Sequence, residues 1–240
     1  MVKQVLRPPT LTLATARAIR EAIFSGELRP GTPLREGELS HLLKVSRSTA
    51  REALRLLQDE GLVQIVPHKG ASVRELSPQT AHEVYTLRAL MEPYAVRLAL
   101  ERQAYTPEDL ANLEALALRL GELELQHGQT YERVKADVEF HYLLCRRSDH
   151  QLLLQMYRTL QSLTWLFVYY FHLYRSAEYS DEPSHYEIFQ AVREGNPTRA
   201  EEVLKHHIEA AGRALLKRMA EVDWQHLAEI TSEPLEQHRS

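Results

Sequence analysis

Residues 34 to 73 read LREGELSHLLKVSRSTAREALRLLQDEGLVQIVPHKGASV, and one helix inside this stretch decides the fold. Ser46 is a favoured N-cap residue, and apolar residues recur after it at the spacing of one helix face. These apolar residues are Ala50, Ala53, Leu54 and Leu57. The pattern predicts an amphipathic helix that starts after Ser46 and stops at Gly61.

The opposite face of this helix is basic. Three arginines recur at every fourth position, and two small hydroxyl side chains lie between the first two of them. These five residues are Arg47, Ser48, Thr49, Arg51 and Arg55. Such a face can reach base edges or phosphates from a DNA groove. A solvated surface helix is the alternative, but Glu52 is the only acid within the stripe, which favours nucleic acid.

The flanking residues predict the rest of a winged helix-turn-helix. A short apolar-faced helix precedes the basic helix, and Lys44-Val45 form the turn between the two. Two predicted strands follow, over 62–66 and 71–74, and an earlier helix lies near 13–25. At the tip of the hairpin, His68 and Lys69 would meet the DNA backbone or the minor groove. A solvent-exposed turn is the alternative for these two residues.

The charges divide the chain in the same place. Residues 1–74 contain 12 Lys and Arg against 7 Asp and Glu, a net charge of +5, while the remainder carries −9. A DNA-binding unit needs positive charge where it meets phosphate. We therefore expect the affinity for DNA to fall steeply with added salt.

The composition is that of an ordinary globular protein, with 44% apolar and 26% charged residues in 240. The single cysteine, Cys145, excludes an internal disulfide and suits a reducing compartment. No signal peptide precedes the first helix, and the apolar run 163–171 is far shorter than the roughly 20 residues of a membrane span. These features predict a cytoplasmic protein with no membrane partner.

The domain boundary is predicted at 75–78, where Ser77 can cap a helix that begins with Pro78. The sequence divides into a DNA-binding domain at 1–74, an all-helical domain at 75–230 and a flexible tail at 231–240. Helices are expected near 79–103, 107–126, 130–147, 150–175, 183–194 and 198–221, with a short seventh near 223–229. The fold class is mainly α: a winged helix-turn-helix followed by an antiparallel helical bundle.

Four polar residues occupy apolar positions in the predicted bundle. Asp137 and His141 lie four residues apart on an inward stripe, and His185 and His207 lie on the inward faces of two later helices. A buried carboxylate is costly unless it is paired or bound to a metal. Imidazole and carboxylate suit Zn, Ni, Fe or Mn. Core histidines bonded to backbone carbonyls are the alternative, and periodicity alone leaves both interpretations open.

The N-terminal motifs resemble a known family. LRPGTPLRE at 28–36, VSRSTAREALRLLQDEGLV at 45–63 and KGASV at 69–73 resemble the DNA-binding domain of GntR-family bacterial transcription factors. The resemblance implies that Arg47, Thr49 and Arg51 read or clamp operator DNA and that Gly70 is the wing glycine. Arg35 departs from the small capping residue usual in the family and adds a candidate phosphate contact.

The C-terminal motifs resemble the FCD effector domain of the FadR subfamily. DVEFH at 137–141, SHYEIF at 184–189 and HI at 207–208 match its motifs. The resemblance implies an all-helical domain in which these four residues, Asp137, His141, His185 and His207, hold a divalent metal, Zn or Ni above all, with Mn or Fe also open. Asp149-His150 departs from the family pattern at a helix cap.

The resemblance also implies that a small carboxylate completes the metal's coordination. Arg88 matches an arginine that faces the effector carboxylate in several members; an i, i+4 salt bridge with Glu92 is the alternative. An aromatic run at 165–174 could line the pocket, with Tyr169 as a candidate effector contact, or could be plain core.

These expectations describe a metabolite-responsive transcriptional regulator, more often a repressor, that binds a palindromic operator as a homodimer. Two other classes remain open. A metalloenzyme would use the same cluster but needs a general base, and no second carboxylate accompanies the ligands on their stripes. A metal sensor or a structural metal site without an organic effector is the other class.

Overall fold

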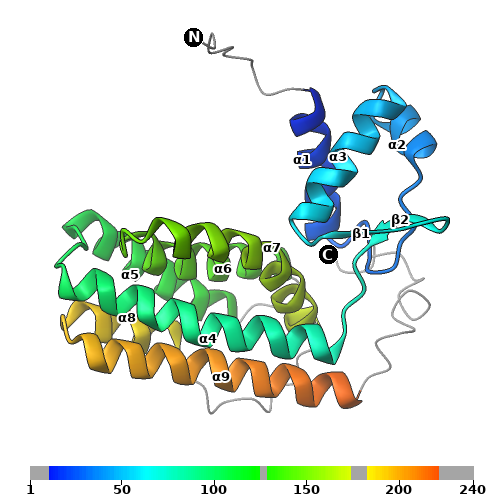
Figure 1. Ribbon diagram of the computed structural model, residues 1–240. Helices are drawn as coiled ribbons and strands as arrows, with labels where there is room; N and C mark the ends of the chain where they lie inside the picture. The colour runs from blue at the N-terminus through cyan, green and yellow to red at the C-terminus, as the bar shows by residue number, and fades with distance from the viewer. Residues whose placement is uncertain (1–10, 125–128, 174–182, 222–240) are drawn as a thin grey trace, which may run out of the picture. The chain divides into compact units, whose positions relative to one another are not determined.

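The computed structural model describes residues 11–124, 129–173 and 183–221. These residues form two compact units that divide between Glu75 and Leu76. The described part is almost entirely helical, with one two-stranded antiparallel sheet. The mainly α fold class expected from the sequence is confirmed (Figure 1). The expected tail at 231–240, the short helix near 223–229 and Tyr174 lie outside the described residues.

The first unit is a winged helix-turn-helix. Its elements are α1 (Leu11–Phe24), α2 (Glu36–Leu42), α3 (Arg47–Asp59), β1 (Val63–Val66) and β2 (Gly70–Val73). Ser46 caps α3 as predicted, because its hydroxyl oxygen accepts the backbone N–H of Thr49 at 3.0 Å. The predicted apolar face of α3 is fully buried, as are Ile19 and Ile23 of α1, which form the core beneath it.

The hairpin that forms the wing pairs Val63 with Val73 and Val66 with Gly70. Its turn needs the left-handed backbone conformation, with φ of 64° at His68 and 89° at Gly70. Glycine adopts this conformation without steric cost, which explains why it stands at residue 70. The strand starts at Gly70, one residue before the sequence predicted.

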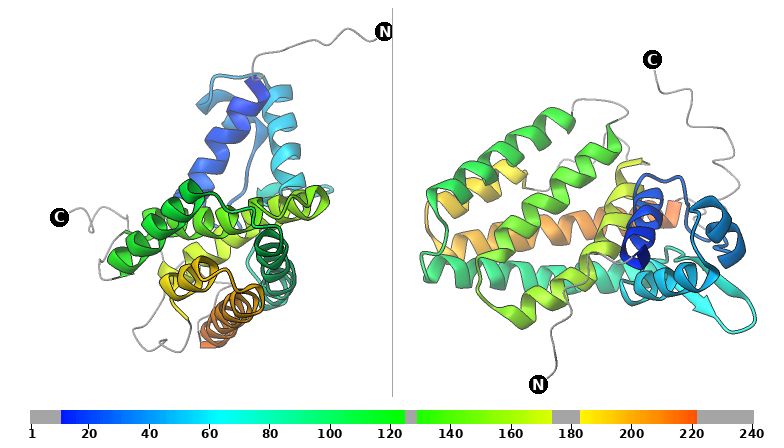
Figure 2. Two further views of the ribbon diagram at one scale, coloured as in Figure 1. Left: turned by 90° about the vertical axis from the view of Figure 1, so that its left-hand side faces the viewer. Right: turned by 90° about the horizontal axis from the view of Figure 1, so that it is seen from above.

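The second unit is a bundle of six described helices. They are α4 (Pro78–Glu101), α5 (Pro107–Glu124), α6 (Thr130–Arg146), α7 (Gln151–Leu173), α8 (His185–Arg193) and α9 (Pro197–Glu221). The long helices α4 and α9 run side by side in every view (Figure 2). Helices α6 and α7 pack on α4, α8 packs on α9, and α5 packs on α6 and α8. All six helices were predicted, with ends that differ by at most two residues.

Local capping explains these boundaries. The hydroxyl of Ser77 accepts the N–H of Thr80 at 3.1 Å, and Ser184 and Glu187 form a reciprocal capping box at α8. At α7 the cap is His150, whose Nδ1 accepts the N–H of Leu153 at 3.2 Å. The departure from the family pattern at Asp149-His150 therefore concerns this cap, as expected.

The close approach of α4 and α9 depends on Gly212. A Cβ placed on this glycine would lie 2.9 Å from the Cβ of Tyr85. No real side chain tolerates that distance, so the small residue sets the spacing of the two longest helices. Within the described residues, no helix is both long and apolar enough to cross a membrane.

Candidate metal centre and DNA-binding face

Three histidines from three different helices converge inside the bundle. His141 lies on α6, His185 is the first residue of α8, and His207 lies on α9. One ring nitrogen of each lies within 4.8 Å of the others. The ring centroids of His185 and His207 are 4.7 Å apart, and His141 stacks on His207 at 5.4 Å. The structure thus brings together the three histidines that the sequence placed on inward stripes.

Hydrogen bonds at Nδ1 fix the orientation of two of the imidazoles. The carboxylate of Glu92 accepts the Nδ1–H of His141 at 2.6 Å, and the carbonyl of Pro183 accepts the Nδ1–H of His207 at 2.7 Å. Each Nδ1 is thus engaged, so Nε2 is the nitrogen of each ring that is left to bind a metal. His141 Nε2 is buried and has no hydrogen-bond partner among the described residues.

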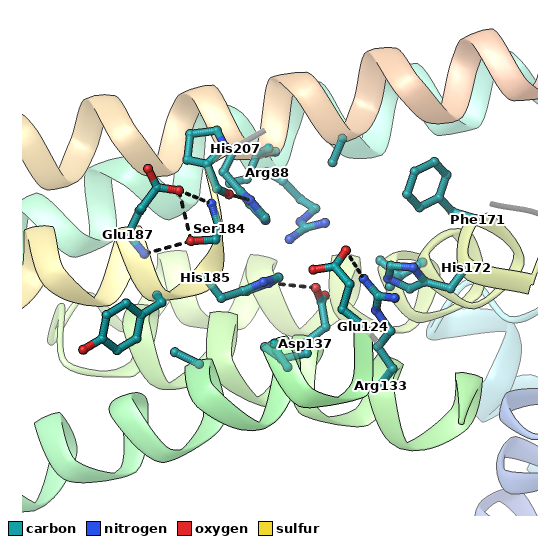
Figure 3. Close-up of a pocket in the computed structure, with 18 of the residues that line it drawn as sticks. Arg88, Glu124, Arg133, Asp137, Phe171, His172, Ser184, His185, Glu187 and His207 are labelled. Carbon is teal, nitrogen blue, oxygen red and sulfur yellow. Dashed lines mark hydrogen bonds and ion pairs between the residues drawn. The ribbon is translucent and has the colours of Figure 1, made fainter. Parts of the chain in front are cut away.

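Asp137 lies beside this cluster. Its Oδ2 is 3.0 Å from His185 Nε2, and its Oδ1 is buried without a hydrogen-bond partner in the described part of the chain (Figure 3). Burial opposes ionisation of this carboxyl, but the hydrogen bond to His185 and the neighbouring positive charges hold its pKa far below the usual range. The carboxylate contacts one histidine and is not part of the set whose atoms all lie within 4.8 Å.

These groups fit a divalent ion. Asp137 Oδ1 and His141 Nε2 are buried polar atoms with no hydrogen-bond partner in the described ranges, which is unusual in a folded protein, and both are natural donors to a metal. Burial, together with the charges of His185 and His141, lowers the pKa of His207 well below its ordinary value, so this imidazole is neutral. A neutral imidazole is the ligand form.

A cavity of about 450 Å³ opens beside the cluster. Its walls include Arg88, Asp137, His185 and His207 (Figure 3). The predicted effector contact and three of the predicted metal ligands thus line the same cavity. Arg88 also forms the predicted alternative, a salt bridge of 2.6 Å from its Nε to Glu92 Oε1. Arg88 therefore forms the salt bridge and also lines the cavity, and its contact with an effector stays a prediction.

Glu92 was predicted only as a salt-bridge partner of Arg88, and its contact with His141 was not predicted. It is fully buried between Arg88 and His141, and these two groups hold its pKa below the ordinary value although burial opposes ionisation. The sequence predicted no second carboxylate on the helix stripes that carry the ligands. The cluster nevertheless has one, because Glu92 of α4 contacts His141. Its signal was an Arg–Glu pair at i, i+4 among apolar residues of α4.

Tyr169 is not among the residues that line the cavity, contrary to the expectation that it contacts the effector. It is buried, and its ring lies edge-to-face with Tyr170 at 5.3 Å. The α7 residues that line the cavity are Val168, Phe171 and His172. The aromatic run is mostly packed core because it lies on a helix that is buried on several sides.

The DNA-binding candidates in the first unit are exposed or partly exposed. Arg35, Arg47, Ser48, Arg51, Arg55, His68, Lys69 and Gly70 are exposed, and Thr49 is half-buried. Ser46 bonds the hydroxyls of both Ser48 and Thr49 at 2.8 Å, so the first turn of α3 is held by its own cap.

The candidate DNA-binding arginines pair with a larger number of acidic residues than their helix stripe alone indicated. Arg51 donates from Nε and Nη2 to the two oxygens of Glu36 on α2, both at 2.8 Å. Arg55 pairs with Glu52 at 2.9 Å, and Arg35 with Glu38 at 2.8 Å. Glu36 escaped the sequence analysis because it lies 15 residues from Arg51 on another helix.

Comparison with known families agrees with both units. Residues 11–73 match the bacterial regulatory proteins of the gntR family, and residues 83–210 match the FCD domain. The chain belongs to the GntR family of transcriptional regulators and carries an FCD domain. The members of these families are regulators and not enzymes, so the metalloenzyme alternative is not supported.

Several curated regulators are similar to this chain. The Nta operon transcriptional regulator of Aminobacter aminovorans is 39% identical over 137 residues, which span 57% of this chain and 63% of that protein. The chain thus covers less than two thirds of that relative. The regulator YdhC of Bacillus subtilis is 28% identical over 83% of this chain and 89% of its own length. The repressor RspR of Escherichia coli is 26% identical over 87% and 90%.

Solved structures show the same fold. Escherichia coli McbR/YncC superposes with a TM-score of 0.72 at 22% identity, over 87% of this chain and 98% of that chain. A GntR regulator from Rhodococcus gives a TM-score of 0.70 at 27% identity, over 86% and 97%. The GntR and FCD expectations from the sequence are therefore confirmed.

Proposed function

We propose that the FCD domain binds one divalent metal ion through Asp137, His141, His185 and His207, and that a small carboxylate completes its coordination. The observation that carries the proposal is the convergence of three imidazoles on one point beside a cavity whose wall includes Arg88. A histidine that serves packing alone bonds both of its nitrogens, whereas His141 Nε2 has no such partner among the described residues.

The donor set favours particular ions. Three imidazoles and one carboxylate suit Zn or Ni best, and Mn or Fe also accept them. Four protein ligands leave positions open on a five- or six-coordinate ion, and the bound ion supplies a Lewis acid for a carboxylate at those positions.

Arg88 would hold the same carboxylate from the cavity wall. A guanidinium has five N–H donors, and its Nε bond to Glu92 leaves donors for a second acceptor. Because Glu92 also fixes His141, one buried carboxylate orients both the predicted metal ligand and the predicted effector contact.

In this proposal the chain is a repressor that binds a palindromic operator as a homodimer, and the carboxylate changes its affinity for that operator. RspR of Escherichia coli, which matches 87% of this chain over 90% of its own length, is named a repressor. Helix-turn-helix proteins that bind two half-sites mirror their own two-fold symmetry in the DNA.

The metal site is tested by comparing His207→Ala with His206→Ala. The two histidines are neighbours on α9, but His207 is in the cluster and His206 is exposed. Metal analysis after equilibration with Zn or Ni should give one ion per chain for the parent and for His206→Ala. The affinity of His207→Ala should be about 100-fold lower, since losing one ligand from a metal site is at least that costly.

His185→Ala provides a second variant in case His207→Ala does not fold, because His185 is partly exposed. The site is refuted if the folded parent binds neither Zn nor Ni. A structural metal without an effector is the remaining alternative. It predicts that a chelator lowers the melting temperature but that no carboxylate raises the melting temperature of the metal-loaded protein.

A further inference from the structure

The effector cavity contains two arginines whose partners differ in burial. Arg88 and Glu92 are both buried, with 3% and 0% of their side chains exposed. Arg133 pairs with Glu124 at 3.0 Å, and these side chains are 17% and 46% exposed. Arg133 and Glu124 both line the cavity, at its α5–α6 side (Figure 3). The cavity therefore presents one deeply fixed guanidinium and one that is held by a more exposed acid.

Glu124 pairs with Arg133 at the cavity wall, where a second carboxylate on a ligand would meet a cation. A carboxylate carried by the protein has a high effective concentration at its partner, so this ligand group would compete with Glu124 for the donors of Arg133. Glu124 would also lie close to the added negative charge. Like charges placed together in a site discriminate against a ligand.

The formal charges of the site agree with this argument. Arg88, Glu92 and Asp137 together carry one negative charge, and a divalent ion would bring the sum to one positive charge. The Arg133–Glu124 pair adds no net charge. The third acid of the wall, Glu187, is left out of this sum because it is exposed and accepts hydrogen bonds from Ser184 in the cap of α8, where the helix N-terminus offsets part of its negative charge.

One negative charge on the ligand would therefore neutralise the loaded site, whereas two would leave an uncompensated charge among buried groups. Uncompensated buried charge is costly. We infer that the cavity selects small monocarboxylates over dicarboxylates, and that Glu124 sets this selectivity by holding Arg133. This inference rests on the proposed function, because it requires a carboxylate at the metal.

The test uses the full-length, zinc-loaded protein and matched pairs of acids. Malate is lactate with an added carboxylate, and succinate is propionate with an added carboxylate, so each pair differs by the one group in question. Isothermal titration would compare the parent with Glu124→Gln. Chelation of zinc by the free acids is the same for both proteins and cancels in the comparison.

The parent should bind lactate at least about 10-fold more tightly than malate, which corresponds to roughly one charge-assisted hydrogen bond. In Glu124→Gln the lactate affinity should stay within a factor of about 3, and the gap between the two acids should shrink by about 10-fold. Adding Arg133→Gln to Glu124→Gln should remove the gain in malate affinity.

Glu122→Gln is the matched control. Glu122 lies on the same helix and pairs with Arg119 at 3.3 Å, but it is not among the residues that line the cavity. The inference is overturned if the parent binds malate as tightly as lactate, or if Glu124→Gln leaves the ratio unchanged. If no acid of either class binds the metal-loaded parent, the proposed function itself fails, which is a different result from equal binding of both classes.

Discussion

At the scale of single residues, the pairing of Arg51 with Glu36 shows how the DNA-binding face is prepared. Glu36 accepts from the Nε and Nη2 of Arg51, which leaves the Nη1 side of the guanidinium for DNA. The hydrogen bond from Arg51 lowers the pKa of Glu36, so the acid is ionised at neutral pH. Glu36 both orients the arginine and places a negative charge near the DNA.

Replacing Glu36 by Gln should therefore weaken sequence discrimination and strengthen non-specific binding. We expect the ratio of specific to non-specific affinity to fall by about 10-fold, because a positioned bidentate arginine contributes about 1–3 kcal/mol of discrimination. Fluorescence anisotropy would measure this ratio with an operator selected by the parent from random palindromes.

Glu38→Gln is the control for this experiment, since Glu38 pairs with the more exposed Arg35. A discrimination ratio unchanged in Glu36→Gln would show that Arg51 needs no orientation by Glu36. Arg51→Ala should lose operator affinity, whereas Arg17→Ala, an exposed change on α1, should not.

The converging histidines could be placed on inward stripes from the sequence because helical periodicity is a local property. Asp137 and His141 share a stripe that any helix over 130–146 must bury. The contact of Glu92 with His141 was not predicted, because the two residues lie 49 positions apart and only the packing of α4 on α6 brings them together. The pairing of Glu124 with Arg133 was not predicted from the sequence, because it depends on how α5 packs on α6.

At the scale of elements, helix starts were predictable because a cap is a contact within four residues. The Thr106 and Asp109 side chains cap α5, and Asp109 also accepts from Arg146 and Arg147, at the end of α6. Only the cap was visible in the sequence. The link between the two helices is a tertiary contact with no local signature.

Asp109→Asn should destabilise the bundle by about 1.5–3 kcal/mol, the usual range for hydrogen bonds to a charged group. Burial opposes ionisation of Asp109, but hydrogen bonds from Arg147, Thr106 and Arg146 lower its pKa well below the ordinary value. Its stabilisation is therefore complete above the unfolded Asp pKa, about 3.9, and is lost as the pH falls below it.

Urea unfolding at several pH values measures this effect. The difference between the parent and Asp109→Asn should be constant from about pH 6 to 8 and should shrink below about pH 4. A difference that grew on acidification would contradict the assignment.

Gly212→Ala tests the packing of α4 on α9. The new Cβ would lie 2.9 Å from the Cβ of Tyr85, and overpacking of this kind costs about 1–3 kcal/mol. Gly121→Ala on α5 is the matched control, because its Cβ would meet nothing within 4 Å and alanine favours helix by up to about 1 kcal/mol. Urea midpoints should therefore move in opposite directions. A neutral Gly212→Ala would mean that the two helices can separate without cost.

At the scale of the whole molecule, the net charge of +5 on residues 1–74 and −9 on the rest assigns the phosphate contacts to the first unit. The two-unit organisation could be anticipated from this division of charge and from the family motifs. The chemistry of the cavity could not, because it depends on side chains from several helices of the bundle.

We propose that the bundle carries a metal-dependent carboxylate site in a dimeric regulator. Native mass spectrometry of the full-length protein, equilibrated with zinc and lactate, tests it most directly. We expect a dimer with one ion per chain and an added lactate that is lost together with the ion in His207→Ala but kept in His206→Ala. A folded chain that carries no ion after exposure to both Zn and Ni would contradict it.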